Sequence, residues 1–225
     1  GMPLNFSPRR SKAVINAITE ISVNDKAVTW SASITDNTQI TVNSSDANFY
    51  SGASLITLEP HFGSDTQTTS TLLSELDSWT SDHKLQGLCY LALKFEWNAD
   101  KFGSLPKVNT ILQGKKVYNP NLDNTVTGGS GSHRADTSST WEYSDNPVLQ
   151  LLDYLRNDRF GMGIANSYFD TNFADWQTAT DVCDTDITPY SGASAIDLLD
   201  SHIVVDTSKK AIDNVKEFLK GCRGY

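Results

Sequence analysis

The amino-acid sequence predicts an α+β protein in which a β-rich N-terminal domain, barrel- or sandwich-like, precedes a smaller α+β domain with about three helices. Apolar residues alternate with period two in the first half of the chain and recur at helical spacing in the last third. A Gly- and Ser-rich stretch with almost no large apolar residue separates the two patterns. Ser, Thr and Asp are abundant, and they favour turns, caps and strands over helix interiors.

Length, charge and cysteine content argue against several classes of protein. The 225 residues are enough for one large or two small domains with a buried core. A net charge of −9 argues against a protein that coats nucleic acid or an anionic membrane, because both need basic surfaces. Three cysteines at no metal-like spacing argue against a disulfide framework. No apolar run approaches the roughly 20 residues that span a bilayer.

Changes in composition divide the chain into four segments. Gly1 before Met2 looks like a remnant of tag removal, so it is set apart from the fold. A terminal Tyr225 after a helix-ending glycine is typical of the first residue of a strand, so we expect the last domain to be truncated. The expected segments are a tag remnant and N-terminal tail over 1–12, a β-rich domain over 13–119, a flexible Gly-, Ser- and Asn-rich loop over 120–140 and an α+β domain over 141–225.

Strand-forming residues and turn signals predict the first strands. The runs 17–23 and 26–33 flank Asn24-Asp25, a dipeptide typical of a tight hairpin turn. Residues 39–42 alternate polar and apolar side chains, and 53–58 form another short apolar run. We therefore expect a hairpin followed by two short strands.

The clearest strand covers residues 85–97. After a loop, the runs 108–112 and 115–118 flank Gln113-Gly114 and predict a second hairpin. The apolar residues of the strand over 85–97 share one face, which we expect to be buried: Leu91, Leu93, Phe95 and Trp97.

Three helices are predicted after the Gly-rich stretch. The first starts at Asn146-Pro147, with proline in the first turn, and ends before Gly161. A second amphipathic helix covers 170–181, and Ser208 is expected to cap the third, which ends at Gly221. The sequence further predicts a strand over 196–206. The core of this domain is expected to contain Leu151, Leu152, Leu155, Trp176 and Phe218.

The motifs of common catalytic and cofactor sites are missing from the sequence. The run Gly128–Gly131 lacks the preceding strand and the Lys-Ser/Thr of a phosphate loop, so we interpret it as a flexible linker. His133 lies in that stretch and is expected to be solvated, and His202 is expected to be structural. None of the four histidines belongs to a zinc-hydrolase pattern: His61, His83, His133 and His202.

One acidic cluster and one single acid are candidate site residues. Asp181, Asp184 and Asp186 alternate as oxygen ligands of a calcium ion do, but the glycine and terminal glutamate of an EF-hand are missing. A solvated helix end is the favoured interpretation. Asp153, beside Tyr154, has no histidine or second acid near it in the sequence, so a structural role is favoured over a catalytic one. The sequence therefore predicts no catalytic residue, no cofactor and no metal site.

Five blocks of the chain, in order, resemble the host-specificity protein J family, the central tail-hub proteins of long-tailed phages and prophages. The first block reads Glu20-Ile21-Ser22-Val23-Asn24-Asp25-Lys26, and the second ends in Gly114-Lys115-Lys116-Val117-Tyr118-Asn119-Pro120. The third contains Tyr143-Ser144-Asp145-Asn146-Pro147, Asp153-Tyr154-Leu155 and Phe160-Gly161-Met162-Gly163. The last two are the helical stretches 173–184 and 208–225.

The resemblance implies a structural protein without catalysis. Members of this family sit at the distal end of the tail tube as trimers and bridge it to the receptor-binding tip. The implied partners are other copies of the chain, tail-tube proteins and distal tail proteins, with no direct nucleic-acid binding. The implied location is the virion tail tip, after synthesis in the bacterial host cytoplasm. Contacts to the host receptor are expected outside this fragment.

Two alternative functions remain open from the sequence. A tail-associated glycan hydrolase needs two carboxyl groups at a fixed separation, and Glu96 with Asp153 is the pair considered. A carbohydrate-binding module needs exposed aromatic side chains that stack on sugars. Its candidates are Trp30, Trp79, Trp97, Trp141 and Trp176.

Overall fold

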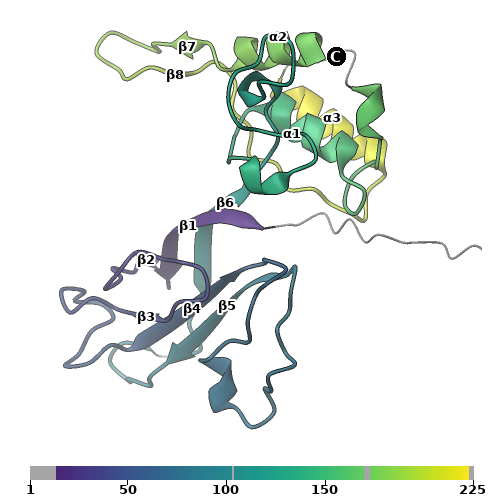
Figure 1. Cartoon of the computed structure of the whole chain (residues 1–225). Coiled ribbons are helices and arrows are strands. Elements are labelled where there is room, and N and C mark those ends of the chain that lie inside the picture. The colour runs from purple at the N-terminus through teal and green to yellow at the C-terminus, as the bar shows by residue number, and fades with distance from the viewer. Residues whose placement is uncertain (1–13, 103, 170–172, 223–225) are drawn as a thin grey trace, which may run out of the picture. The chain divides into compact units, whose positions relative to one another are not determined.

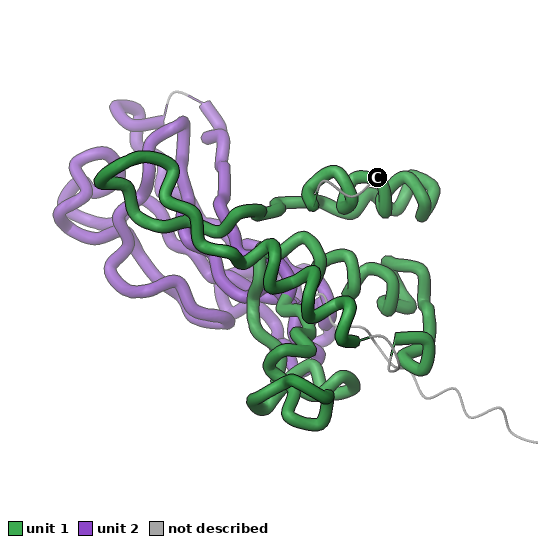
Figure 2. The backbone as a smooth tube through the Cα atoms, turned by 90° about the horizontal axis from the view of Figure 1, so that it is seen from above, with its two compact units in different colours: residues 1–11, 116–225 green, residues 12–115 purple. Residues whose placement is uncertain are grey.

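The computed structural model describes residues 14–102, 104–169 and 173–222 (Figure 1). These residues form two compact units, one up to Lys115 and one from Lys116 onward (Figure 2). We call them the β unit and the helical unit. Antiparallel sheets dominate the first, and the three α-helices of the described residues lie in the second. The predicted α+β class is therefore confirmed.

Two three-stranded antiparallel sheets build the β unit. One has the order β2-β1-β6 and the other the order β3-β4-β5. The strands of the first sheet are β1 (Ile15–Val23), β2 (Lys26–Ala27) and β6 (Val108–Lys115). Those of the second are β3 (Ile40–Thr41), β4 (Ile56–Phe62) and β5 (Cys89–Phe95). A 3₁₀ turn, η1 (Leu73–Glu75), lies in the long connection between β4 and β5.

The first predicted hairpin is confirmed. Asn24 and Asp25 have φ angles of 49° and 61°, which is the left-handed pair that a two-residue turn of type I′ requires. Val23 pairs with Lys26 across this turn. The second strand is shorter than predicted, because it ends at Ala27 and Trp30 instead forms an isolated bridge to Val42.

The second predicted hairpin is wrong. Residues 108–115 form one continuous strand, β6, which pairs with β1 from Val108↔Val23 to Lys115↔Ile15. Gln113 pairs with Ala17 in this ladder. Gln113-Gly114 does not form a turn, because β1 pairs with the residues on both sides of Gly114 and keeps the strand continuous.

The core of the β unit draws on both sheets. One cluster contains Val23 from β1 and Ile56 from β4, and a second contains Ile21 and Leu58 from the same two strands. Leu91, Leu93 and Phe95 of β5 pack against these clusters. Trp97 does not, as 71% of it is exposed, because β5 ends at Phe95. Its predicted burial is therefore wrong.

In the helical unit, α1 packs against both other helices. The helices are α1 (Pro147–Arg156), α2 (Phe173–Cys183) and α3 (Ala211–Gly221). The predicted core forms two clusters, one around Leu152 and one around Leu151 and Phe218, and Leu155 and Trp176 pack against both. The predicted start of the second helix at residues 170–172 lies outside the described residues. No helix in the described part of the chain is long and apolar enough to cross a membrane.

Two local predictions in this unit are wrong. The strand expected over 196–206 is only the two-residue β8 (Ile196–Asp197), paired with β7 (Asp186–Ile187). Ser208 does not cap α3, because its backbone N–H and its hydroxyl both donate to the Asp206 carboxylate. The residue at the N-cap position is Lys210, which makes no side-chain capping bond.

The segment 120–140 packs onto the helices, where Val126 and Ala135 contact the cluster around Leu152, although the sequence predicts an exposed loop. It contains the 3₁₀ turns η2 (Pro120–Leu122) and η3 (Ser138–Thr140), and a third, η4 (Asn166–Tyr168), follows α1. A side chain on Gly129 would place Cβ 2.3 Å from the carbonyl oxygen of Asp123, and one on Gly131 would place it 2.6 Å from that of Leu122. These glycines permit close backbone packing. The mobility of the segment stays a prediction.

Candidate functional site

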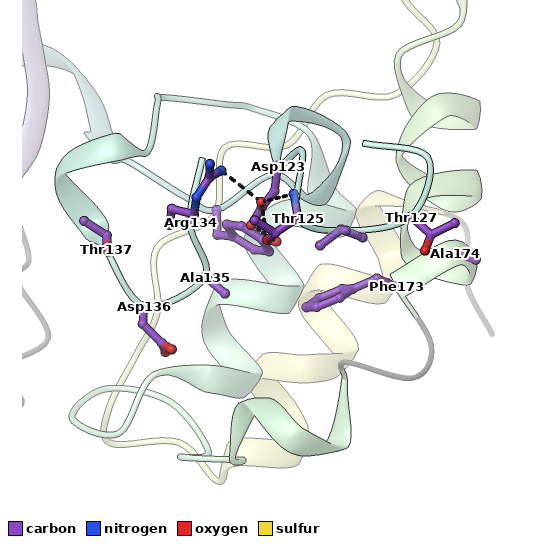
Figure 3. A pocket seen from close by; sticks show the side chains of 11 residues that line it. Asp123, Thr125, Thr127, Arg134, Ala135, Asp136, Thr137, Phe173 and Ala174 are labelled. Carbon is purple, nitrogen blue, oxygen red and sulfur yellow. Dashed lines mark hydrogen bonds and ion pairs between the residues drawn. The ribbon is translucent and has the colours of Figure 1, made fainter. Parts of the chain in front are cut away.

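A polar pocket of about 600 Å³ opens in the helical unit (Figure 3). Its walls come from the segment after Lys116 and from the first turn of α2. Threonines, two carboxylates and one guanidinium give it a polar lining. The lining residues are Tyr118, Asp123, Thr125, Val126, Thr127, Arg134, Ala135, Asp136, Thr137, Phe173 and Ala174.

Asp123 is the buried charge of this pocket, only 1% exposed. Its Oδ1 accepts hydrogen bonds from the backbone N–H of Thr125 at 2.9 Å and from the hydroxyl of Thr125 at 2.6 Å. Its Oδ2 accepts one from the Tyr118 hydroxyl at 2.9 Å. Burial alone would raise the pKa of Asp123, but these hydrogen bonds and the charge of Arg134 hold the pKa below its ordinary value.

Arg134 balances this carboxylate. Its Nη1 lies 3.0 Å from Oδ1 of Asp123 and also donates to the carbonyl oxygen of His133, while its Nη2 donates to Asn124 Oδ1 at 2.8 Å. The guanidinium therefore joins the start of the 123–134 stretch to its end. The second carboxylate, that of Asp136, accepts a hydrogen bond from Asn166.

This chemistry favours a structural role for the Asp123–Arg134 pair over acid–base catalysis. A general acid at neutral pH needs a carboxyl group whose pKa is raised. The pKa of Asp123 is lowered, and four donor groups already occupy its oxygens. The pair instead ties the first half of the segment to the second.

The structure corrects the prediction for one of the four histidines. His133 is buried, 3% exposed, although the sequence predicts a solvated side chain. Its Nδ1 accepts a hydrogen bond from the backbone N–H of Asn119, and burial lowers its pKa. Its burial follows from the packing of the segment 120–140. His83 stacks on Trp79 with ring centroids 5.0 Å apart, and His202 is exposed.

His61 belongs to a buried cluster that sequence reasoning misses. It is fully buried, stacks on Tyr90 with centroids 4.3 Å apart, and places Nε2 3.2 Å from Oε1 of Glu59. Glu59 also accepts from the backbone N–H groups of Thr71 at 3.0 Å and Leu72 at 2.7 Å. The signal in the sequence lies in β4, where Glu59 and His61 alternate with apolar residues. An acid and a histidine two positions apart share one face of a strand and can pair there, which allows the strand to be buried on both faces.

The Glu59 carboxylate is held ionised. Burial would raise its pKa, but the bonds from Leu72 and Thr71 and the hydroxyl of Ser70 hold the pKa below its ordinary value. Ser70 donates its hydroxyl to Glu59 at 3.1 Å and makes no hydrogen bond to His61 among those found in the described residues. The three residues therefore do not form the relay of a serine hydrolase, and the cluster fastens the connection after β4 onto the sheet.

The acidic group at the end of α2 is dispersed into separate contacts. Asp181 accepts from Asn121 at 2.7 Å, and Asp184 accepts from Asn146 at 2.6 Å. Burial and the neighbouring carboxylates of Asp197 and Asp181 raise the pKa of Asp184. No group of His, Cys, Asp and Glu suited to a metal ion is found in the part of the chain that the structure describes. Burial raises the pKa of the nearby Cys183 thiol to about 11, which keeps it protonated at neutral pH.

The residues of the two alternative functions do not come together within a unit. Glu96 lies in the β unit beside Lys94, and Asp153 lies in the helical unit on α1. Trp30 and Trp141 pack against core clusters, as Trp176 does. Of the five tryptophans considered for sugar stacking, Trp97 alone falls in the exposed class.

An acidic hairpin extends away from the three helices (Figure 1). We give this name to residues 184–198, which contain β7 and β8. Every residue in it except Ala193 is exposed, including the apolar side chains of Ile187, Tyr190, Ile196 and Leu198. The chain contains no Lys or Arg between Arg159 and Lys209.

A second exposed apolar surface lies along β6, at the outer edge of its sheet among the described strands. Residues 104–116, which we call the lysine edge, contain the exposed side chains of Leu105, Ile111 and Leu112. Lys107, Lys115 and Lys116 lie in the same stretch, and no Asp or Glu occurs between Asp100 and Asp123.

Comparison with known proteins finds one informative similarity. No protein-family profile matches the chain. A stretch of 91 residues is 33% identical to the baseplate hub protein pb3 of Escherichia phage T5. The match covers 40% of this chain and 8% of that protein, so the chain corresponds to a small part of its relative's length.

Proposed function

We propose that this chain is a structural part of a phage tail hub or baseplate. The observation that carries the proposal is the 33% identity to a baseplate hub protein over 40% of the chain. The order of the motifs along the sequence points to the same class, because five blocks resemble the central hub proteins of long-tailed phages.

The finer proposal is a hub at the tail tip that links the tail tube to the receptor-binding tip, in the manner of the host-specificity family. Its partners are other copies of itself, in a trimer, together with tail-tube and distal tail proteins. We place the receptor contacts outside this stretch. Virion assembly brings weak contacts together at high effective concentration, so small interfaces on each unit suffice.

We further propose that the chain has no catalytic activity. The two carboxylates considered for glycan hydrolysis, Glu96 and Asp153, belong to different units. The buried acids Asp123 and Glu59 have lowered pKa values and are saturated with donors, which suits ionised structural groups. The paired charges of the 600 Å³ pocket are already committed to each other.

Labelling of phage particles tests the location. Antibodies raised against the purified chain are applied to intact particles and to isolated tails of the phage or prophage whose DNA encodes it. Electron microscopy is expected to show label at the distal end of the tail, with an antibody against the major capsid protein as the positional control. Label on the head or along the tube contradicts the proposal. Unlabelled tails contradict it as well when mass spectrometry shows that they lack the chain.

A cell-wall clearing assay tests the absence of catalysis. The chain is incubated with purified peptidoglycan beside a lysozyme control, and no clearing is expected. Clearing that Glu96→Gln or Asp153→Asn abolishes, with the fold intact by circular dichroism, would establish the hydrolase alternative instead. Retention of the chain on a glycan column would favour the carbohydrate-binding alternative.

A further inference from the structure

The acidic hairpin is a structure that is incomplete by itself. Its two strands pair over only two residues each, and an isolated two-stranded ribbon is marginally stable in water. Asp186 stands directly opposite Asp197 across the ladder, where like charges destabilise the pairing. The next pair, Ile187 and Ile196, is exposed. A partner that supplies both positive charge and apolar surface would relieve each of these defects.

The base of the hairpin is nevertheless anchored. The Leu199 N–H donates to the Cys183 carbonyl at 3.2 Å, and the Ser201 N–H donates to the Asp145 carbonyl at 2.8 Å. Cys183 and Ser201 are buried. The hairpin is thus presented by the helical unit as a defined projection whose apolar side chains stay between 36% and 72% exposed among the described residues.

The lysine edge has the complementary properties. β6 is eight residues long and pairs on one side only, with β1. Long edge strands with apolar side chains invite pairing with another chain. Ile111 is 59% exposed and Leu112 is 48% exposed, and the stretch carries lysines without acidic residues. Lys107, with 68% of its side chain exposed, reaches one carboxylate, that of Asp25, at 3.6 Å.

We propose that the acidic hairpin of one copy of this chain docks along the lysine edge of a second copy. The inference rests on the proposed function, because a trimeric hub requires contacts between copies. Three features match across the contact: unpaired strand edges, exposed aliphatic side chains and opposite charge. Since the hairpin and the edge are different surfaces, the contact is head-to-tail. Such a contact closes a ring of three when the rotation between neighbouring copies is 120°, and each hairpin then meets one edge.

Disulfide trapping tests the contact. The background carries Cys89→Ala and Cys222→Ser and keeps the buried Cys183. One variant adds Tyr190→Cys on the hairpin, and a second, of different mass through a tag, adds Ile111→Cys on β6. A matched control adds Leu88→Cys, which is in the same unit and 53% exposed against 59% for Ile111. Because the isolated contact is weak, the variants are mixed at the highest soluble concentration under mild oxidation.

The expected product is the mixed dimer of the Tyr190→Cys and Ile111→Cys chains, roughly tenfold above that formed with the Leu88→Cys control. Lys107→Glu with Lys116→Glu is expected to reduce it by about tenfold, and Lys84→Glu, an exposed lysine outside the edge, is expected to leave it unchanged. Raised salt is also expected to reduce it, because exposed charges are screened.

Three results would overturn the inference. They are mixed dimers no more frequent than with the control, Ile111→Cys homodimers in excess of mixed ones, and, in a further variant that carries both Tyr190→Cys and Ile111→Cys, disulfides confined to single chains. Antibody labelling of the tail is independent of all three. If antibodies label the tail but the chain does not cross-link, only the proposed contact is contradicted. If the chain cross-links but is absent from tails, only the proposed function is contradicted.

Discussion

At the scale of single residues, buried carboxylates organise both units. Glu59 in the β unit and Asp123 in the helical unit are 2% and 1% exposed. Each accepts hydrogen bonds from backbone N–H groups and hydroxyls of residues that follow it in the chain. An ionised group in this position fastens a connection that has little apolar surface of its own, and removal of its charge leaves several donors without an acceptor.

Glu59→Gln is expected to lower the free energy of unfolding by about 1–3 kcal/mol at neutral pH, because its amide cannot accept from all the donors that surround the carboxylate. The folded-state pKa of Glu59 lies below the unfolded value, so its stabilisation is present above the unfolded pKa and is lost as the pH falls through the folded one. The neighbouring titratable groups are His61 and Tyr90. Urea denaturation as a function of pH measures the difference in the free energy of unfolding between wild type and Glu59→Gln.

The difference between wild type and Glu59→Gln is therefore expected to shrink on acidification. The control is Glu75→Gln, an exposed acid whose pair with Lys94 spans 3.0 Å and which is expected to change stability little. A difference that stays constant from neutral to acidic pH would show that the carboxylate charge does not contribute.

Gly129→Ala is expected to destabilise the helical unit by about 1–3 kcal/mol, because the new methyl group must displace backbone. Its Cβ would lie 2.3 Å from the Asp123 carbonyl oxygen and 2.5 Å from that of Pro120. Gly114→Ala is the control, since no atom lies within 4 Å of its Cβ position. Thermal unfolding decides between this packed arrangement and a flexible linker, in which both substitutions would be equally tolerated.

At the scale of elements, one residue joins the start of α1 to the end of α2. The side chain of Asn146 accepts from the backbone N–H of Val148 at 2.9 Å, which caps the helix. Its amide group donates to the Thr180 carbonyl at 3.1 Å and to the Asp184 carboxylate at 2.6 Å. One residue thus caps α1 and fixes the last turn of α2 beside it.

Asn146→Ala is expected to cost about 1–2 kcal/mol through the lost cap alone, and more through the two acceptors left without a donor. Asn146→Asp separates the contributions. An aspartate still caps the helix, but it places a second carboxylate against Asp184, whose pKa is already raised by burial and neighbouring acids. We therefore expect Asn146→Asp to destabilise the unit as well, as measured by urea denaturation. Wild-type stability in this variant would mean that capping is the whole role of Asn146.

At the scale of the whole molecule, each unit has a core of its own. Leu58 in the β unit and Leu152 in the helical unit are both fully buried, in separate clusters. Units with independent cores and few shared groups respond separately to substitution.

Leu58→Ala and Leu152→Ala are each expected to cost about 2–5 kcal/mol, through lost burial and the cavity left behind. Hydrogen exchange followed by mass spectrometry locates the effect. Leu152→Ala is expected to accelerate exchange in residues 116–222 and leave the core strands of the β unit protected, with the converse for Leu58→Ala. Equal acceleration across both units after either substitution would show that the chain unfolds as one cooperative body.

The sequence by itself determined the features that depend on residues a few positions apart. Asn24-Asp25 made the first hairpin turn because both residues tolerate positive φ. Asn146-Pro147 started α1, and the leucines at helical spacing supplied its buried face. The α+β class follows from these local periods, and each of these features is decided by backbone preferences that neighbouring residues set.

The tertiary structure decided the features in which a residue is paired or buried by a segment distant in the chain. β6 became one strand because β1, about 90 residues earlier, pairs with its whole length. Glu59 is buried because the connection that follows β4 supplies hydrogen bonds to it, among them one from Leu72. His133 is buried because the backbone of Asn119, at the start of the same loop, donates to its ring. The Gly-rich stretch packs because carbonyl groups of residues 120–123 approach it within the reach of a side chain. These contacts cannot be predicted from a pattern of residue types, because they join segments that are far apart in the chain. The entropy cost of closing the loop between such segments is offset only by contacts that form once the chain has folded.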